Sequence, residues 1–222
     1  MKSLELFCGT KSFTKNISSR CEEVITLDFC KDFNPTICCD ILDWDYTQFK
    51  PYYFDIIWAS PPCENYSSIK NCWLGREIKV DGVMTLYTKE IRDKQRLYSD
   101  KLVLKTFEII KYFNPYFWYV ENPQSGDLKN RPFMKDVPFY DVDYCRYCDW
   151  GYRKRTRIWT NKENWNNLLC NKDCGNLTPR GTKHRTDPFS NKKTEYFSIK
   201  GMTQLDVRHR MPPNLIFSLL QE

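Results

Sequence analysis

The chain has 222 residues, of which 41% are hydrophobic and 16% aromatic, and its formal net charge is +6. This length is typical of one domain with at most a small appendage, and the apolar content excludes a natively disordered chain. No apolar run approaches the ~18 residues of a membrane span, and the first residues lack the apolar core of a signal peptide. We therefore expect a soluble, intracellular, monomeric protein with no membrane partner, whose eleven cysteines are reduced.

Basic residues are concentrated in the later third of the chain. Residues 146–210 contain 15 Lys and Arg against 6 Asp and Glu, whereas residues 1–145 contain 19 against 21. Such an asymmetry indicates a polyanionic partner that the later third contacts. The alternative is a basic surface that meets only solvent.

The first predicted strand, residues 3–7, runs into a turn at Gly9. Backbone amides at such a turn, and at the start of the following helix, suit a carboxylate or an amino-acid group. A second strand, residues 24–28, ends in Asp28. An acidic residue about 20 positions after a glycine turn is well placed to bind the hydroxyls of a ribose. A surface aspartate that starts a turn is the alternative.

A third short strand ends at Asp40, and a fourth, apolar strand over residues 56–59 is followed by Pro61, Pro62 and Cys63. Prolines stop a strand, so they form a rigid turn that carries one thiol. Open α/β sheets bind their ligands at this end of the strands, and a thiol held there is suited to be a nucleophile. The alternative is that Cys63 is one more small buried apolar residue.

Residues 68–88 have no clear period, and we expect an irregular lid or substrate loop there. Residues 91–113 have the strongest helical period in the chain, which Asn114 and Pro115 end. A further strand leads to Glu121. A glutamate at a strand tip beside an apolar wall is suited to carry a proton. The less favoured alternative is a cap of the following helix.

Two more strands are predicted, over residues 139–144 and 152–159. The second places Arg153, Arg155 and Arg157 on one face of the pleat. Residues 161–205 are polar, basic and irregular.

Four stretches, in this order, resemble the DNA (cytosine-5)-methyltransferase family, and short members from large DNA viruses and phages in particular. They are LELFCGTKS at 4–12, FDIIWASPPCENYS at 54–67, YVENP at 119–123 and YRKRTRIW at 152–159, with a fifth near Pro212 and Pro213. The family has a glycine-bearing cofactor loop, a Pro-Cys nucleophile loop, a Glu-Asn dipeptide and an Arg-x-Arg pair. It usually has a second glycine where Lys11 stands here and often a glutamine where Arg153 stands.

The resemblance implies an α/β, Rossmann-like class I methyltransferase fold that uses S-adenosylmethionine, with a mostly parallel sheet flanked by helices. Residues 1–160 and 206–222 would form the catalytic and cofactor-binding domain. Residues 161–205 would form a small target-recognition segment. The proline turn near residue 212 would lead a helix that packs beside the cofactor loop.

The resemblance also implies roles for individual residues. Cys63 would bond to carbon 6 of a cytosine flipped out of double-stranded DNA while Glu121 protonates the ring, so that carbon 5 accepts the methyl group. Arg155 and Arg157 would lie at the base pocket. The implied cofactor-binding residues are Phe7, Gly9, Thr10, Ser12, Asp28, Asp40, Ser60 and Pro61. The implied DNA-binding residues are Ser67, Arg153, Lys154, Lys183 and Arg185.

Cysteine spacing predicts a zinc site as one of two alternatives. Cys145 and Cys148 form one close pair, and Cys170 and Cys174 form another, with His184 after them. Three of these cysteines, Cys145, Cys170 and Cys174, would bind the metal together with either Cys148 or His184. The other alternative is a set of unlinked thiols.

Three other functions stay open at this point. An RNA cytosine methyltransferase would use the same residues, because the pocket reads the base and not the sugar. An exocyclic-amine methyltransferase would have an aromatic residue where Cys63 stands. A DNA-binding relative without activity is the third. A viral protein of this kind would work in the nucleus or the cytoplasm of the host.

Overall fold

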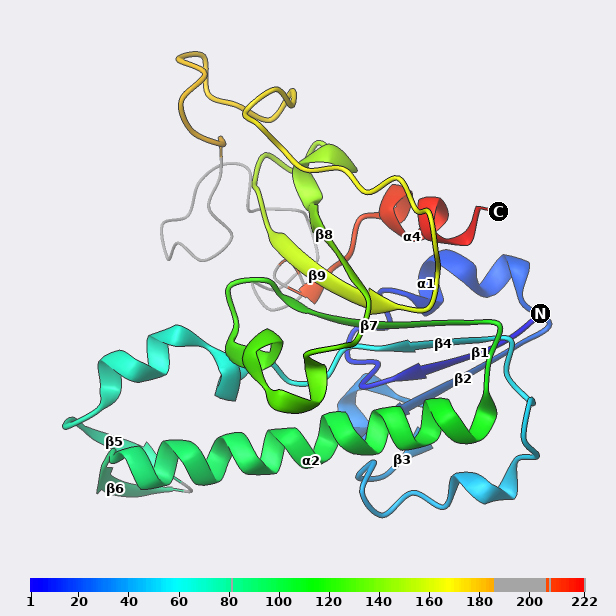
Figure 1. Cartoon of the computed structure of the whole chain (residues 1–222), viewed down its shortest axis with the longest axis horizontal. Helices are drawn as coiled ribbons and strands as arrows, with labels where there is room; N and C mark the ends of the chain where they lie inside the picture. Colours follow the sequence, from blue (N-terminus) through cyan, green and yellow to red (C-terminus); the bar gives the residue numbers. More distant parts are fainter. Residues whose placement is uncertain (81, 186–206, 208, 222) are drawn as a thin grey trace.

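The computed structural model describes residues 1–80, 82–185, 207 and 209–221. Seven strands form one sheet in the order β3-β2-β1-β4-β7-β9-β8 (Figure 1). They are β1 (Lys2–Leu6), β2 (Glu23–Asp28), β3 (Ile37–Cys38), β4 (Ile56–Ala59), β7 (Phe117–Pro123), β8 (Phe139–Asp143) and β9 (Arg155–Thr160). Strands β3, β2, β1, β4 and β7 run parallel, whereas β9 is antiparallel to both of its neighbours. The predicted, mostly parallel sheet is confirmed.

Two helical layers cover this sheet. The long helix α2 (Lys89–Phe113) lies along one face, and the short helices α1 (Thr14–Ile17) and α4 (Pro213–Leu220) lie on the other (Figure 1). The connections contain the 3-10 helices η1 (Ser18–Arg20), η2 (Lys31–Phe33), η3 (Tyr46–Gln48), η4 (Glu64–Tyr66), η5 (Ser68–Trp73), η6 (Asp127–Asn130), η7 (Pro132–Met134) and η8 (Tyr144–Arg146). Within the described part of the chain, no helix is both long and apolar enough to cross a bilayer.

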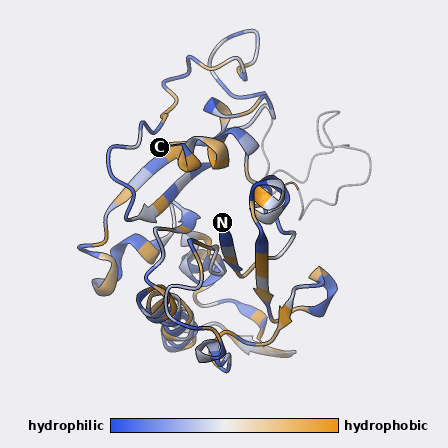
Figure 2. Ribbon diagram, turned by 90° about the vertical axis from the view of Figure 1, so that its right-hand side faces the viewer, coloured by the Kyte–Doolittle hydropathy of each residue, from blue (hydrophilic) through white to orange (hydrophobic). Residues whose placement is uncertain are grey.

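The side chains of β4 alternate between two hydrophobic cores. Ile57 and Ala59 pack in the core that includes α2, and Ile56 and Trp58 pack in the core that includes α1 and α4. All four are buried, which explains why this strand is a continuous apolar run rather than an alternating one. Figure 2 shows α2 nearly along its axis, with hydrophobic and hydrophilic residues both present around the helix, as expected where one side packs on a sheet.

The boundaries of α2 follow from its caps. Thr88 Oγ1 accepts a hydrogen bond from the amide of Ile91 at 3.4 Å, which satisfies one of the free donors of the first turn. Asn114 adopts a left-handed backbone with φ of 43°, a conformation that asparagine tolerates better than most residues. The predicted helix and its end before Pro115 are confirmed.

The prediction of an irregular segment over residues 68–88 was wrong. The segment contains η5 and an antiparallel hairpin, β5 (Glu77–Val80) paired with β6 (Val83–Leu86). Ile78, Val80, Val83 and Thr85 are β-branched residues that favour strands, but each strand has only four residues, so the segment as a whole shows no clear period.

The predicted target-recognition segment is described only over residues 161–185. That part contains no helix or strand and has a single isolated bridge, between Leu177 and His184. Residues 186–205 lie outside the described residues. The irregular character predicted for residues 161–185 is confirmed, while the division of the chain into two functional regions stays a prediction.

Buried hydrogen bonds connect β1 to the turn that follows it. The carboxylate of Glu5, which is 3% exposed, accepts hydrogen bonds from the amides of Phe13 and Thr14 and from the Thr14 hydroxyl. The amide of Met211 donates to Ser12 Oγ at 2.7 Å, and α4 follows directly. The predicted closing helix beside the glycine turn is therefore confirmed.

The buried position of Glu5 predicts a pH-dependent stability. Burial raises the pKa of Glu5 from 4.5 to about 7, although the hydrogen bonds from Thr14 and Phe13 lower it. Its protonation therefore stabilises the fold fully below about pH 4.5, and this contribution is lost as the pH rises through about 7. The difference corresponds to roughly 3 kcal/mol.

We expect the Glu5→Gln variant, whose side chain cannot ionise, not to lose this stability as the pH rises. Urea unfolding of both proteins between about pH 5 and 8 measures the effect. The stability of the variant relative to the original protein should rise with pH. A constant difference across this range would contradict the assignment.

Candidate active site

A cavity of about 320 Å³ lies where the carboxyl ends of β1, β4 and β7 meet. Its walls include the glycine turn after β1, the Pro-Pro-Cys turn after β4 and the Glu-Asn pair at the end of β7. Parallel strands bring these three stretches to the same edge of the sheet. The structure thereby places Cys63 and Glu121 on one cavity.

The turn after β4 directs Cys63 into this cavity. The buried Asn122 side chain donates a hydrogen bond to the carbonyl of Pro61 at 2.9 Å, which attaches the turn to β7. The Cys63 side chain is reached by solvent, yet protein atoms surround it and raise the pKa of its thiol. The carboxylate of Glu121 raises this pKa further, and the ammonium of Lys154 lowers it. The thiol is therefore protonated at neutral pH until something removes its proton.

Glu121 is 7% exposed and has two polar neighbours. The Tyr144 hydroxyl donates to Glu121 Oε1 at 3.3 Å, and Lys154 Nζ lies 3.7 Å from the same oxygen. Lys154 also lies over the ring of Tyr144, with its Nζ 5.0 Å from the ring centre. A carboxyl group, a phenol and an ammonium are thus available in or next to the wall of one cavity for proton transfer.

A second cavity of about 180 Å³ adjoins the first and shares Phe7, Pro62 and Glu64 with it. Its apolar walls are Leu27, Cys39, Ile41 and Leu102, and its polar groups include Asp28, Asp40 and Tyr98. An apolar slot with a few acceptors suits a purine nucleoside. The predicted cofactor residues Phe7, Gly9, Thr10, Ser12, Ser60 and Pro61 line the first cavity, and Phe7, Asp28 and Asp40 line the second.

Both predicted acids already accept hydrogen bonds from the protein. The carboxylate of Asp28 accepts from the amides of Gly9 and Cys30, each at 2.9 Å. Asp40 accepts from the amide of Leu42 at 2.9 Å and from the Tyr98 hydroxyl at 3.3 Å. Each carboxylate oxygen can accept more than one hydrogen bond, so both acids retain capacity for a ligand.

The glycine turn keeps its shape despite Lys11. Gly9 has φ of 45° and Lys11 has φ of 57°, so both lie in the left-handed region that glycine favours. The Lys11 ammonium donates a hydrogen bond to the carbonyl of Asn34, which holds the lysine in this unfavourable backbone conformation. A second glycine is therefore not required for this turn.

The structure does not bring Arg155 and Arg157 to the cavity. Arg155 makes a two-pronged ion pair with Asp143, at 3.0 and 2.7 Å, and Arg157 makes one with Asp141, at 2.7 and 2.8 Å. Side chains alternate along a strand, and Ile158 is paired with Glu121 across β7 and β9. The even-numbered positions of β9 therefore share the face of Glu121, and the arginines lie on the opposite face.

The other residues predicted to bind DNA lie at several places. Arg153, Lys183 and Arg185 are exposed, and Arg153 Nε lies 3.8 Å from a carboxylate oxygen of Asp143. Ser67 is half-buried and accepts a hydrogen bond from the amide of Ile69 at 3.4 Å. Lys154, in contrast, lines the cavity beside Glu121.

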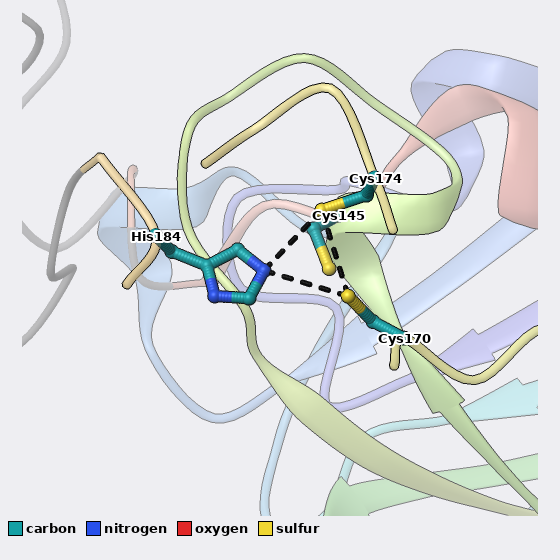
Figure 3. Close-up of side chains that lie close together, drawn as sticks. All are labelled: Cys145, Cys170, Cys174 and His184. Carbon is teal, nitrogen blue, oxygen red and sulfur yellow. Dashed lines mark hydrogen bonds between the residues drawn. The ribbon is translucent and has the colours of Figure 1, made fainter. Parts of the chain in front are cut away.

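The cysteine pairs form one cluster of four side chains. Cys145, Cys170, Cys174 and His184 have their ligand atoms within 4.8 Å of one another (Figure 3). Cys148 lies outside this group, and its thiol donates to the carbonyl of Tyr144 at 3.1 Å. Of the two alternatives for the fourth ligand, the structure favours His184.

Several cavity residues were not predicted, among them Glu5, Glu64, His209 and Met211. Glu5 had a recognisable signal, because a charged residue inside a buried parallel strand needs a structural or chemical reason. The resemblance places Lys154 among the DNA-binding residues, whereas the structure places it in the cavity wall. Strand alternation shows that Lys154 lies on the same face as Glu121, but only once the register between β7 and β9 is known.

No protein-family model matches the chain. A curated relative is the "Probable DNA (cytosine-5)-methyltransferase" of Frog virus 3 (isolate Goorha), which is 36% identical over 225 residues and covers 99% of both chains. Among solved structures, the Entamoeba histolytica methyltransferase EhMeth superimposes with a TM-score of 0.51 at 15% identity. That match covers 77% of this chain and 55% of the other, so the chain spans about half the length of that structure.

The structural match shows the fold alone, and it confirms the predicted Rossmann-like methyltransferase architecture. The sequence match extends over the whole chain and carries the family assignment. On these grounds, the chain belongs to the DNA (cytosine-5)-methyltransferase family.

Proposed function

We propose that the protein transfers a methyl group from S-adenosylmethionine to carbon 5 of cytosine in double-stranded DNA, through a covalent bond to Cys63. The observation that carries this proposal is the shared cavity of Cys63 and Glu121 at the carboxyl edge of the sheet. Membership of the family supports the same reaction.

The two adjoining cavities fit S-adenosylmethionine. The nucleoside would occupy the smaller cavity, with Phe7 against the base and Asp28 and Asp40 as hydrogen-bond acceptors. The amino-acid part would lie at the turn of Gly9 to Ser12 in the larger cavity. The bound sulfonium compound supplies an electrophilic methyl group.

Carbon 5 of cytosine is a poor nucleophile, and Cys63 changes this. Its sulfur, as thiolate, forms a bond to carbon 6 while ring nitrogen 3 takes a proton, which leaves an electron-rich enamine at carbon 5. After carbon 5 accepts the methyl group, it loses its proton. That proton passes to water, the electron pair of the C–H bond restores the ring double bond, and the bond between sulfur and carbon 6 breaks to release the Cys63 thiolate. Ring nitrogen 3 returns its proton to Glu121.

Glu121 is the proposed proton donor to ring nitrogen 3, because it lines the cavity that contains Cys63. Lys154 lies 3.7 Å from Glu121 and lowers the pKa of Cys63. We assign to Lys154 the task of favouring the thiolate of Cys63. Arg155 and Arg157 are proposed to hold β9 against β8 through their ion pairs, and so to position Lys154, which directly precedes Arg155.

A base inside a duplex cannot reach this cavity, so the cytosine has to leave the stack. Residues 146–185 contain ten Lys and Arg against three Asp and Glu. Arg153, Lys183 and Arg185 are exposed members of this set. We propose that they bind the phosphate backbone, which makes the affinity depend on salt.

Trapping with 5-fluorocytosine tests the covalent step. Fluorine cannot leave carbon 5 as a proton does, so the Cys63 adduct persists after methylation. We expect a duplex containing 5-fluorocytosine to form a denaturation-resistant adduct with the protein in the presence of S-adenosylmethionine, and Cys63→Ser to form none. Gel electrophoresis and peptide mass spectrometry measure the adduct and locate it.

Cys72→Ser is the matched control, because Cys72 is also an exposed cysteine and lines neither cavity. It should trap DNA as the original protein does. Methyl label on an exocyclic amine without an adduct would refute the proposal. If the protein transfers methyl groups to single-stranded RNA but not to duplex DNA, its substrate is RNA rather than DNA.

Phe7→Ala tests the cofactor cavity. Loss of stacking on a base costs about 1–3 kcal/mol, so we expect S-adenosylmethionine to bind roughly five- to a hundred-fold more weakly. Calorimetry or equilibrium dialysis measures the affinity. Tyr116→Ala, which removes an exposed ring before β7, should leave it unchanged. Equal affinities of Phe7→Ala and the original protein would exclude the assigned cavity.

Lys154→Met tests the electrostatic assignment. Because Lys154 lowers the pKa of Cys63, its removal should raise that pKa, and Cys63 should react several times more slowly with iodoacetamide near neutral pH. Lys154→Arg should largely restore the rate. The rate of alkylation of the Cys63 peptide, measured as a function of pH, reports the pKa of Cys63. Lys101→Met, on α2, is the control and should leave this rate unchanged. An unchanged pH profile in Lys154→Met would remove this role.

A further inference from the structure

Four metal-binding side chains from separate stretches of the chain meet beside β8, away from the groups used in methyl transfer. Cys145 belongs to η8, Cys170 and Cys174 follow β9, and His184 is paired with Leu177 in the isolated bridge. Figure 3 shows the three sulfur atoms and the imidazole converging on one point. Cys145 and Cys170 are each 3% exposed.

Three distances within the cluster are close to those of ligands around one ion, and all four ligand atoms lie within 4.8 Å of one another. Cys170 Sγ lies 3.5 Å from Cys174 Sγ, and His184 Nε2 lies 3.6 and 3.4 Å from these two sulfurs. In a tetrahedron with zinc–sulfur bonds of about 2.3 Å and zinc–nitrogen bonds of about 2.0–2.1 Å, the corresponding edges are roughly 3.8 and 3.6 Å. A disulfide would require about 2.05 Å.

We infer that Cys145, Cys170, Cys174 and His184 bind one zinc ion as a structural site. Thiolate and imidazole ligands together favour zinc over hard cations such as magnesium or calcium. Four protein ligands leave no open position, which is typical of structural rather than catalytic zinc.

Hydrogen bonds around the cluster fix the ligands in place. The amide of Lys172, whose φ is 64°, donates to Cys170 Sγ at 3.3 Å. The buried Asn176 side chain donates to the carbonyls of Cys145 and Cys148, at 2.9 and 2.7 Å. Such outer contacts orient metal ligands and are a regular part of metal sites.

The site gives order to a segment that has little structure of its own. Residues 161–185 contain no helix or strand. The amide of Cys170 donates at 2.9 Å to Asp143 Oδ2, the carboxylate that Arg155 also holds. The metal would therefore attach this basic segment to the β8–β9 hairpin, whose second strand begins directly after Lys154.

Metal analysis of the full-length protein tests the inference. The protein is purified under reducing conditions without added metal or chelator, and its zinc content is measured by mass spectrometry. We expect about one zinc per chain, and at least a tenfold lower ratio in Cys174→Ser. Cys148→Ser is the matched control, because this thiol is three residues from Cys145 but outside the cluster, and its ratio should stay near one.

A second measurement on the unmodified sequence covers the case in which Cys174→Ser fails to fold. Alkylation of Cys145, Cys170 and Cys174 should be slow in the protein as purified and fast after a chelator is added, while Cys38 and Cys72, which are exposed, react rapidly in both. A zinc ratio near zero in folded protein would overturn the inference. So would a disulfide between Cys170 and Cys174, or equal loss of zinc from Cys148→Ser.

Limited proteolysis tests the role of the ion. After chelation, trypsin should cut faster after Lys172 and Arg180, and its cutting within α2 should not change. Equal acceleration in α2 would refute a role confined to this segment. These readouts do not involve methyl transfer, so their failure and that of the proposed enzymatic reaction are distinguishable.

Discussion

The parallel alignment of β1, β4 and β7 is the constraint on which the site depends. Each strand ends in a short stretch with its own chemistry, and a shared direction brings the three ends to one edge. The buried hydrogen bond from Asn122 to the Pro61 carbonyl then attaches the Pro-Pro-Cys turn to the end of β7. Cys63 and Glu121 therefore reach the same cavity although 58 positions separate them in the sequence.

The β8–β9 hairpin divides its charges between the two faces of the sheet. Cross-strand ion pairs hold Arg155 to Asp143 and Arg157 to Asp141 on one face, and Lys154 points to the Glu121 face. Directly opposed charges on neighbouring strands stabilise a pair of strands, and they are more effective when forked and partly buried. This arrangement gives the arginines a structural partner each and leaves an amine, rather than a guanidinium, beside the carboxyl group in the cavity.

Asp143 connects this hairpin to the cysteine cluster. Its fully buried carboxylate accepts hydrogen bonds from Arg155 and from the amide of Cys170, one of the four clustered residues. A buried carboxylate is stable only when such partners compensate its charge. The segment after β9 and the strand beside the cavity therefore share one buried carboxylate as a hydrogen-bond partner.

Local pattern was sufficient for most of the architecture. Apolar runs, the caps of α2 and the turn residues after β1 and β4 each act within a few positions, so the long helix and the position of Cys63 at a strand end followed from them. The mostly parallel sheet was implied by the resemblance to the family. The β5–β6 hairpin was missed although Ile78 and Val80 alternate with charged residues and an Asp-Gly pair follows them, because strands of four residues give only a short signal. Three features depend on strand register and on contacts between distant stretches: the face on which Lys154 lies, the partners of the two arginines, and the choice of His184 over Cys148. No local pattern encodes these, because a shift of one residue in register would exchange the two faces without changing the sequence.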